Sequence, residues 1–170
     1  MSPKPQVMRI VPLGQVPHFA GPLAAAHAAE WQHLYEHWDT GHALQDFAVQ
    51  HSDGRLPATL VALAGDDLLG SVSLIFDDLP GWEHLNPWLA SFYVFPAHRR
   101  CGVGTALLAA ADALFRAQRV ACAFLFTETR ARYFTRRGWR ALAPTEVLGH
   151  HVTIMRKDFL APARQEPRNQ

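Results

Sequence analysis

The chain has 170 residues, of which 49% are hydrophobic and 18% charged, so it is long enough for one substantial core and too short for two ordinary domains. Its net charge of +1 gives no overall field that would favour nucleic acid or an anionic membrane as a partner. Its apolar stretches are interrupted well before the roughly 20 residues of a membrane-spanning helix, and two cysteines make no disulfide framework. We therefore expect a cytoplasmic protein with one domain over residues 1–160 and a disordered tail over 161–170.

The first third of the chain predicts one strand and two helices. Residues Val7 to Val11 resemble a short strand, followed by a loop. Apolar residues then recur at spacings of three and four from Phe19 onward, which predicts an amphipathic helix. The run Asp39-Thr40-Gly41 would end this helix, and a second helix would cover Ala43 to Gln50.

The middle of the chain predicts three strands in succession. Thr59 to Ala64 and Leu68 to Phe76 are rich in β-forming residues and are joined by Gly65-Asp66-Asp67, the pattern of a hairpin. A loop from Asp77 to Pro87 follows, and Trp88 to Val94 is the third strand.

Helices and strands alternate in the last third. A helix with one apolar face begins at Gly104, and the nearly unbroken apolar run Val120 to Phe126 predicts a strand covered on both faces. Residues Arg130 to Arg137 would form a short helix, and His151 to Met155 a last strand. This order of elements predicts an α/β fold with one mixed sheet and helices on both sides.

The segment from Phe92 to Leu108 combines a strand, a tight glycine loop and a helix start. A helix start offers unpaired backbone N–H groups and the positive end of a dipole, so it can hold a diphosphate. Gly102 and Gly104 let the backbone approach an anion without a Cβ in the way, and Arg99 and Arg100 add positive charge. A Rossmann motif would need a third glycine, and a Walker loop would need Gly-Lys-Ser/Thr, which is absent.

The pattern Arg99-x-x-Gly102-x-Gly104 resembles the acetyl-CoA pyrophosphate motif of the GNAT (Gcn5-related N-acetyltransferase) superfamily. The order of elements from Thr59 to Trp139 is also similar to that family. The resemblance implies a GNAT-like acyl-CoA N-acyltransferase fold, with a mostly antiparallel sheet, and acetyl-CoA as the acyl donor. The cofactor-binding residues that it implies are Phe92, Tyr93, Val94, Arg99, Arg100, Cys101, Gly102, Val103, Gly104 and Thr105.

The resemblance further implies N-acetylation of a primary amine of a small molecule or peptide by direct attack on the thioester. Pantetheine would pair along the strand ending at Val94, in a cleft where that strand splays from the one ending at Phe126, and a backbone N–H near Tyr93 or Val94 would polarise the carbonyl. Dimers are common in the family, so we include a homodimer among the expectations.

The sequence departs from the family at the residue four positions before Gly138, where the family often has a tyrosine as the thiol's general acid and this chain has Phe134. Tyr133 is next to it and becomes the candidate acid, while Glu128 and Glu83 are candidates for proton transfer. The departure also motivates an alternative, a GNAT-fold module that binds acyl-CoA or a protein partner without turnover.

The acceptor pocket would be shaped by the segments Trp31–Thr40 and Asp77–Trp88, which contain the candidate substrate-binding residues Trp31, Asp78 and Trp88. Carboxylates in the second segment would attract a cationic amine, although a solvated polar loop explains them as well. Trp31 is equally suited to the core or the cleft wall, and Glu128 is equally suited to a helix N-terminus.

Residues His33 to His37 match H-x-x-E-H, a zinc-protease pattern. Chance matches are frequent in a chain with ten histidines, and no third ligand stands out downstream. We therefore predict no metal site and keep a zinc hydrolase as a competing hypothesis. His150 and His151 could line the cleft or lie at an exposed strand start.

Overall fold

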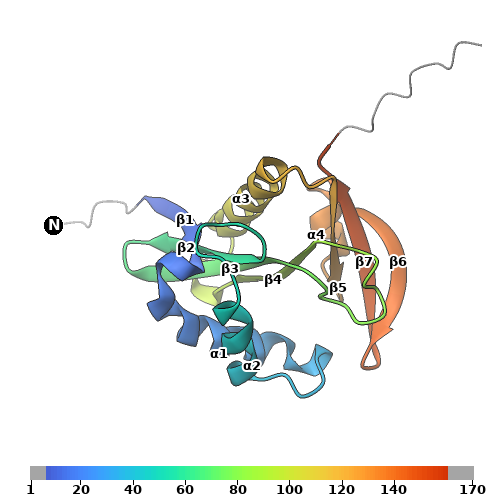
Figure 1. Cartoon of the computed structure of the whole chain (residues 1–170), viewed down its shortest axis with the longest axis horizontal. Coiled ribbons are helices and arrows are strands. Elements are labelled where there is room, and N and C mark those ends of the chain that lie inside the picture. Colours follow the sequence, from blue (N-terminus) through green and yellow to red (C-terminus); the bar gives the residue numbers. More distant parts are fainter. Residues whose placement is uncertain (1–6, 161–170) are drawn as a thin grey trace, which may run out of the picture.

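The computed structural model describes residues 7–160, so the predicted tail 161–170 lies outside the described residues. Seven strands form one sheet in the order β1-β2-β3-β4-β5-β7-β6, in which only β4 and β5 pair in parallel (Figure 1). The strands are β1 (Met8–Pro12), β2 (Ala58–Ala64), β3 (Asp67–Ile75), β4 (Trp88–Val94), β5 (Cys122–Thr127), β6 (Arg140–Val147) and β7 (His150–Asp158).

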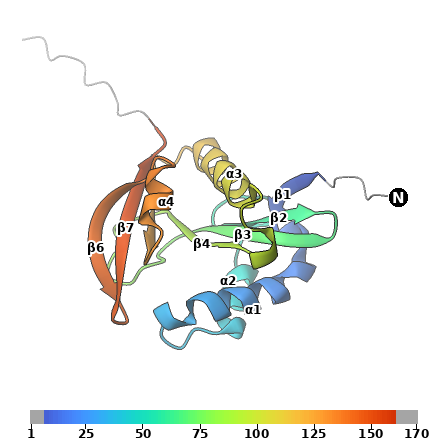
Figure 2. The same ribbon diagram turned by 180° about the vertical axis from the view of Figure 1, so that it is seen from behind.

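Helices cover both faces of this sheet. They are α1 (Ala20–Trp31), α2 (Thr40–Ala48), α3 (Val103–Ala117) and α4 (Ala131–Thr135), with short 3-10 helices η1 (Leu13–Gln15), η2 (Pro17–Phe19), η3 (Gln32–Leu34) and η4 (Pro96–His98). Figures 1 and 2 show α3 on one side of β2–β4 and the pair α1 and α2 on the other. The predicted α/β class, with a mixed, mostly antiparallel sheet, is therefore confirmed. Within residues 7–160, no helix has the length and apolar character needed to cross a membrane.

The main core lies between α3 and the sheet. Leu107, Ala111 and Phe115, on the apolar stripe of α3, are fully buried against β-strand residues such as Val72 and Met155. Their spacing places them on one helical face, as the sequence predicts. This packing fixes the start of α3 close to the end of β4.

Strands β4 and β5 separate soon after they begin. Their only paired residues are Trp88 and Phe124, and the Phe124 N–H donates to the carbonyl oxygen of Pro87 at 3.0 Å. Figure 1 shows β5, β7 and β6 turned steeply away from β1–β4. The predicted splay between these strands is therefore present, and backbone pairing does not close the space between their later residues.

A bulge interrupts β4 beside this opening. Tyr93 pairs with Ser71 and Ala90 with Ser73, so Ser91 and Phe92 together oppose the single residue Val72. Ser91 has a φ of 47°, a left-handed conformation that is rare for a residue other than glycine. Bulges re-aim side chains and leave backbone groups unpaired, often near functional sites.

The predicted first helix was too long. Helix α1 ends at Trp31, and the run Asp39-Thr40-Gly41 begins α2 instead of ending α1. Asp39 is the N-cap of α2, because its carboxylate accepts the backbone N–H of His42 at 3.0 Å. A carboxylate in that position satisfies an N–H group that has no partner inside the helix.

Sequence analysis also missed β6. This strand contains Pro144 and lies at the edge of the sheet, where it pairs with β7 alone. Proline is tolerated on an edge strand because one side of the strand makes no ladder hydrogen bonds. Pro144 therefore argued against a strand in the sequence, and the strand forms because it lies at the edge of the sheet.

Candidate active site

A cleft of about 630 Å³ lies between the diverging strands. Its walls come from β4 and β5, one end from the glycine loop before α3, and the other from the segment after α1. The cleft therefore joins the predicted anion site to a region of aromatic and acidic side chains.

The start of α3 forms the first end of the cleft. Gly102 is its N-cap with a φ of 82°, and no side chain caps the free N–H groups of the first turn. A Cβ at position 104 would lie 3.0 Å from both Phe92 Cζ and Tyr133 Oη. Gly102 is thus required for its conformation and Gly104 for the space beside it, which leaves backbone donors open to an anion.

Four arginines, Arg99, Arg100, Arg130 and Arg137, line the same cleft. The Arg99 Nε–H donates to the carbonyl oxygen of Val94 at 2.9 Å, which ties the loop to the end of β4. The Arg137 guanidinium carbon lies 3.6 Å from the centroid of the Tyr133 ring, and its Nη1–H donates to the Tyr133 carbonyl oxygen at 3.0 Å. Positive side chains around an uncapped helix start suit a diphosphate.

Aromatic side chains line the middle of the cleft. The rings of Trp31 and Tyr93 meet edge to face, with centroids 5.9 Å apart. Behind them His27 is buried and its Nε2 lies 2.8 Å from Ser71 Oγ. Burial lowers the pKa of His27 to about 3, so this imidazole is neutral at physiological pH and packs behind the residues that line the cleft.

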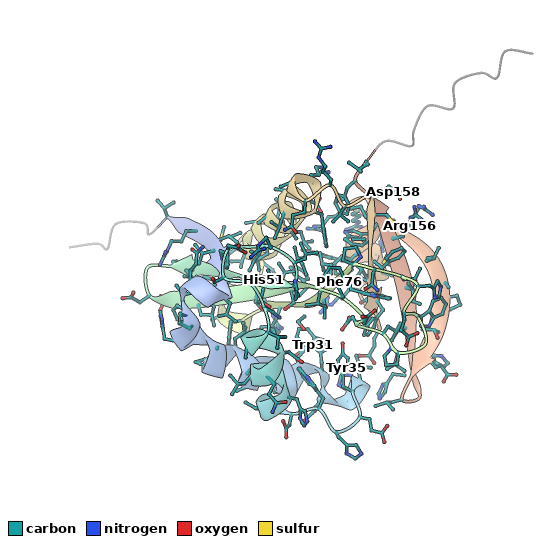
Figure 3. The ribbon with its side chains drawn as sticks, in the orientation of Figure 1. Trp31, Tyr35, His51, Phe76, Arg156 and Asp158 are labelled. Carbon is teal, nitrogen blue, oxygen red and sulfur yellow. The ribbon has the colours of Figure 1, made fainter. Side chains whose placement is uncertain are left out.

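A half-buried aspartate and a tyrosine define the second end of the cleft. The Tyr35 hydroxyl donates to Asp78 Oδ1 at 3.1 Å, and in Figure 3 Trp31 and Tyr35 project from the segment around the end of α1 toward the central strands. Burial raises the pKa of Asp78 to about 7; the Tyr35 hydrogen bond opposes that rise and the charge of Asp46 adds to it. The pKa of Tyr35 is raised well above 10 by burial and by Asp78. Asp78 can therefore exchange a proton near neutral pH.

Glu128 is the second carboxylate of this end, directly after β5. His33 Nε2 lies 2.9 Å from its Oε2, and His150 Nδ1 lies 3.1 Å from its Oε1. Each carboxylate oxygen therefore has its own imidazole partner.

Comparison with known proteins agrees with this arrangement. Residues 23–139 match the model of a family described as the acetyltransferase (GNAT) family. The chain belongs to the GNAT family. The search of curated proteins found no match.

Solved structures share the GNAT fold at low sequence identity. A GNAT-family protein from Desulfovibrio desulfuricans is 21% identical with a TM-score of 0.67, covering 91% of this chain and 100% of its own. Ard1 from Thermoplasma volcanium is 17% identical with a TM-score of 0.66, covering 91% and 99%. The yncA protein from Salmonella typhimurium, solved with its cofactor acetyl-CoA, is 16% identical with a TM-score of 0.69, covering 94% and 98%.

The cleft brings together most residues that the GNAT resemblance predicted for cofactor binding. Two of the ten do not line it: Val103 is buried in the core, and Cys101 is exposed and donates its S–H to the Arg99 carbonyl oxygen at 3.4 Å. The remaining eight line it, namely Phe92, Tyr93, Val94, Arg99, Arg100, Gly102, Gly104 and Thr105.

The candidate catalytic and substrate-binding residues also divide into those that line the cleft and those that do not. Trp31, Asp78, Glu128 and Tyr133 line the cleft. Trp88 does not, because its side chain is fully buried in the cluster around Phe124; the predicted substrate contact is corrected to a core role.

Glu83 also lies outside the lining of the cleft. It is exposed, and its carboxylate accepts the Gly81 N–H at 2.8 Å, which lowers its pKa. This contact stabilises a turn in the loop before β4, and the predicted proton transfer by Glu83 stays a prediction without support from the cleft geometry.

The zinc-protease pattern does not form its helix. Helix α1 ends at Trp31, η3 ends at Leu34, and Tyr35 is extended. His33 and His37 therefore do not share the face of an α-helix that H-x-x-E-H needs.

Sequence analysis missed Tyr35, Arg130 and Arg137 as cleft residues. Tyr35 looked like one more residue of an amphipathic helix, and nothing local signals its contact with Asp78, 43 residues away. The two arginines are the first and last residues of the short helix predicted over Arg130 to Arg137, next to the segment before Gly138 that resembles the family, so their charge near that segment was the available signal.

Proposed function

We propose that this protein transfers an acetyl group from acetyl-CoA to a primary amine of a small molecule or peptide. The observation that carries the proposal is the continuous cleft. It runs from an uncapped helix start at Gly102, with a clear approach beside Gly104, to the half-buried Asp78. Such a cleft has a place for a diphosphate at one end and for proton transfer at the other.

The residues at the glycine loop suit acetyl-CoA. The free N–H groups at the start of α3 would hold the diphosphate, supported by Arg99, Arg100 and Arg137. The extended chain of the cofactor would follow β4 past the bulge at Ser91. Acetyl-CoA supplies an acyl thioester, whose carbonyl carbon a neutral amine attacks directly. Polarisation of that carbonyl by the N–H of Tyr93 or Val94 stays a prediction.

Asp78 is the general base of this proposal. A general base works best when its pKa lies near the working pH, and the pKa of Asp78 is about 7. As a carboxylate it would accept the proton that the amine loses, and the Tyr35 hydroxyl would hold it in place. Glu128 lines the same end, and its negative charge would attract the ammonium form of the acceptor.

The acceptor end suits a cationic amine. Glu30, Asp78 and Glu128 supply carboxylates, and the rings of Trp31 and Tyr35 stand among them. Carboxylates concentrate ammonium groups, and aromatic faces attract them when water is excluded. A protonated amine would therefore collect beside the base that deprotonates it.

The leaving thiol has no tyrosine at the expected position. Phe134 is buried against Phe92 and Trp139, whereas the Tyr133 hydroxyl lies beside Gly104 at the anion end. A thiol loses its proton near pH 8 to 9, so the thiolate is a tolerable leaving group without an acid. The same observation favours the second candidate function, an acyl-CoA-binding module without turnover.

Two measurements on the purified protein test the proposal. Thermal unfolding with and without acetyl-CoA reports binding, and release of free CoA with a panel of primary amines reports turnover. A rise in Tm together with amine-dependent CoA release supports the enzyme, and a rise without release supports the binding module. No rise and no release would refute both. A cytoplasmic location and a homodimer stay predictions.

A further inference from the structure

We propose that His33, Glu128 and His150 form a binding site for a divalent transition-metal ion, Zn²⁺ in the first instance, at the acceptor end of the cleft. The site goes beyond the proposed acetyl transfer and does not depend on it. It also differs from the metal pattern that the sequence suggested, with which it shares only His33.

The three side chains already converge. His33 Nε2 is 2.9 Å from Glu128 Oε2, His150 Nδ1 is 3.1 Å from Glu128 Oε1, and the two imidazole rings meet edge to face with centroids 4.9 Å apart. All three ligand atoms lie within 4.8 Å of one another. Within residues 7–160, no other group of three histidine, cysteine, aspartate or glutamate side chains is gathered this closely.

The spacing matches the needs of zinc. Zn²⁺ binds histidine nitrogen and carboxylate oxygen at about 2.0–2.2 Å, so tetrahedral ligand atoms are separated by roughly 3.3 Å, the value that follows from those bond lengths. The His33 and His150 nitrogens lie 2.9 and 3.1 Å from the two different oxygens of Glu128, and one ligand atom from each of the three residues lies within 4.8 Å of the others. A small rotation of the side chains would admit the ion between them.

The ligands come from three separate parts of the fold. His33 belongs to η3, Glu128 follows β5, and His150 begins β7. His33 and Glu128 are 95 residues apart in the chain, so the sheet and the α1–α2 connection must both be in place before the site exists. The three side chains are 41%, 30% and 43% exposed, which leaves an ion access from solvent.

Three protein ligands leave a fourth position on the ion. Two histidines and one glutamate with an open position is a ligand set that zinc uses in reactive sites. Because Glu128 also lines the cleft, the fourth ligand would be a water molecule or an oxygen or nitrogen atom of the acceptor. The metal ion and a protonated amine would then compete for the carboxylate of Glu128.

Metal content of the full chain tests the proposal. The protein is prepared without an affinity tag, stripped with a chelator, mixed with Zn²⁺, passed through a desalting column and analysed for metal. Residues 1–6 and 161–170 contain no histidine or cysteine, so the chain ends add no competing soft ligand. We expect one zinc ion per chain, and a Co²⁺ derivative with the intense visible absorption of a four-coordinate ion.

Substitutions locate the ion. His33→Ala, His150→Ala and Glu128→Gln should each weaken Zn²⁺ affinity by about tenfold or more, because loss of a direct ligand costs at least as much as loss of an outer partner. His37→Ala and His151→Ala are the matched controls: their imidazoles are 90% and 89% exposed and come from the same two segments, and zinc affinity should not change.

Circular dichroism verifies that each variant is folded, and the Co²⁺ spectrum of the unaltered chain provides a readout that needs no variant. Absence of retained zinc and of a four-coordinate Co²⁺ spectrum would overturn the proposal. Equal zinc retention by the His33 and His150 variants would also overturn it, since the ion would then be bound elsewhere. Neither result would bear on acetyl transfer, which is measured separately.

Discussion

Replacing Asp78 with asparagine should stabilise the protein at neutral and alkaline pH while it impairs the reaction. The pKa of Asp78 is about 7 in the folded protein, against 3.8 for an unperturbed aspartate. Below about pH 4 the carboxyl is protonated in both states, so its titration costs no stability. As the pH rises toward about 7, the unfolded chain has released the proton and the folded chain keeps it. The free energy of unfolding therefore falls through this window and levels off above it.

The magnitude follows from the size of the shift. A difference of about three pKa units corresponds to about 4 kcal/mol. Asp78 keeps part of its surface open to the cleft, and water there offsets part of the burial penalty, so we expect about 2 kcal/mol. Asparagine retains an oxygen that can accept the Tyr35 hydroxyl and has nearly the same volume, and the substitution thus removes little besides the charge.

Urea unfolding of Asp78→Asn and the unaltered chain at pH 4 and pH 8 measures this effect. The variant should gain about 2 kcal/mol at pH 8 and only about 0.5 kcal/mol at pH 4. Its kcat/KM should fall about 100-fold or more through loss of the base. Asp66→Asn, in the exposed β2–β3 turn, removes the same charge and should show no such dependence on pH. A stability difference between Asp78→Asn and the unaltered chain that is equal at both pH values would refute the reasoning.

Three further predictions follow, two on the cleft and one on a helix position outside it. Tyr35→Phe removes a hydrogen bond that lowers the pKa of Asp78, so the ascending limb of the pH profile of kcat/KM should shift to higher pH. Asp46→Asn removes a charge that raises the same pKa, so the limb should shift to lower pH. Identical limbs in the variants and the unaltered chain would contradict the assignment of Asp78 as the base. Gly104→Leu places a side chain where even a Cβ is 3.0 Å from two neighbours. Acetyl-CoA at 100 times its Kd should stabilise the unaltered chain against unfolding by about 2.7 kcal/mol, and this gain should be lost in the variant. An unchanged rise in Tm with acetyl-CoA would rule out this loop as the cofactor site. Gly21→Ala, at a helical position with open space around it, should raise stability by about 0.5–1 kcal/mol and leave acetyl-CoA binding intact.

The glycine-loop end of the cleft could be predicted from the sequence because it is local. Strand β4, the glycine loop and the apolar stripe of α3 follow one another within 30 residues (Trp88–Ala117), and glycine conformation and helical periodicity depend mainly on near neighbours. The two β2–β3 strands and the strand β5 were predicted for the same reason. Errors occurred where neighbours in the chain gave the wrong signal, as at Asp39, which caps the next helix.

The acceptor end was decided by tertiary structure alone. Tyr35 and Asp78 are 43 residues apart and His33 and Glu128 are 95 apart, and no periodicity in the chain connects them. The pKa of Asp78 depends on burial by several segments, and the cleft itself exists because β4 and β5 pair at one position and then diverge. Sequence by itself determined the family and the fold class and predicted the glycine loop as the cofactor site, since these rest on local motifs and their order. The protonation state of Asp78, the partners of the cleft carboxylates and the shape of the acceptor end were visible only in the folded chain. Burial and long-range contacts arise only when distant segments pack together.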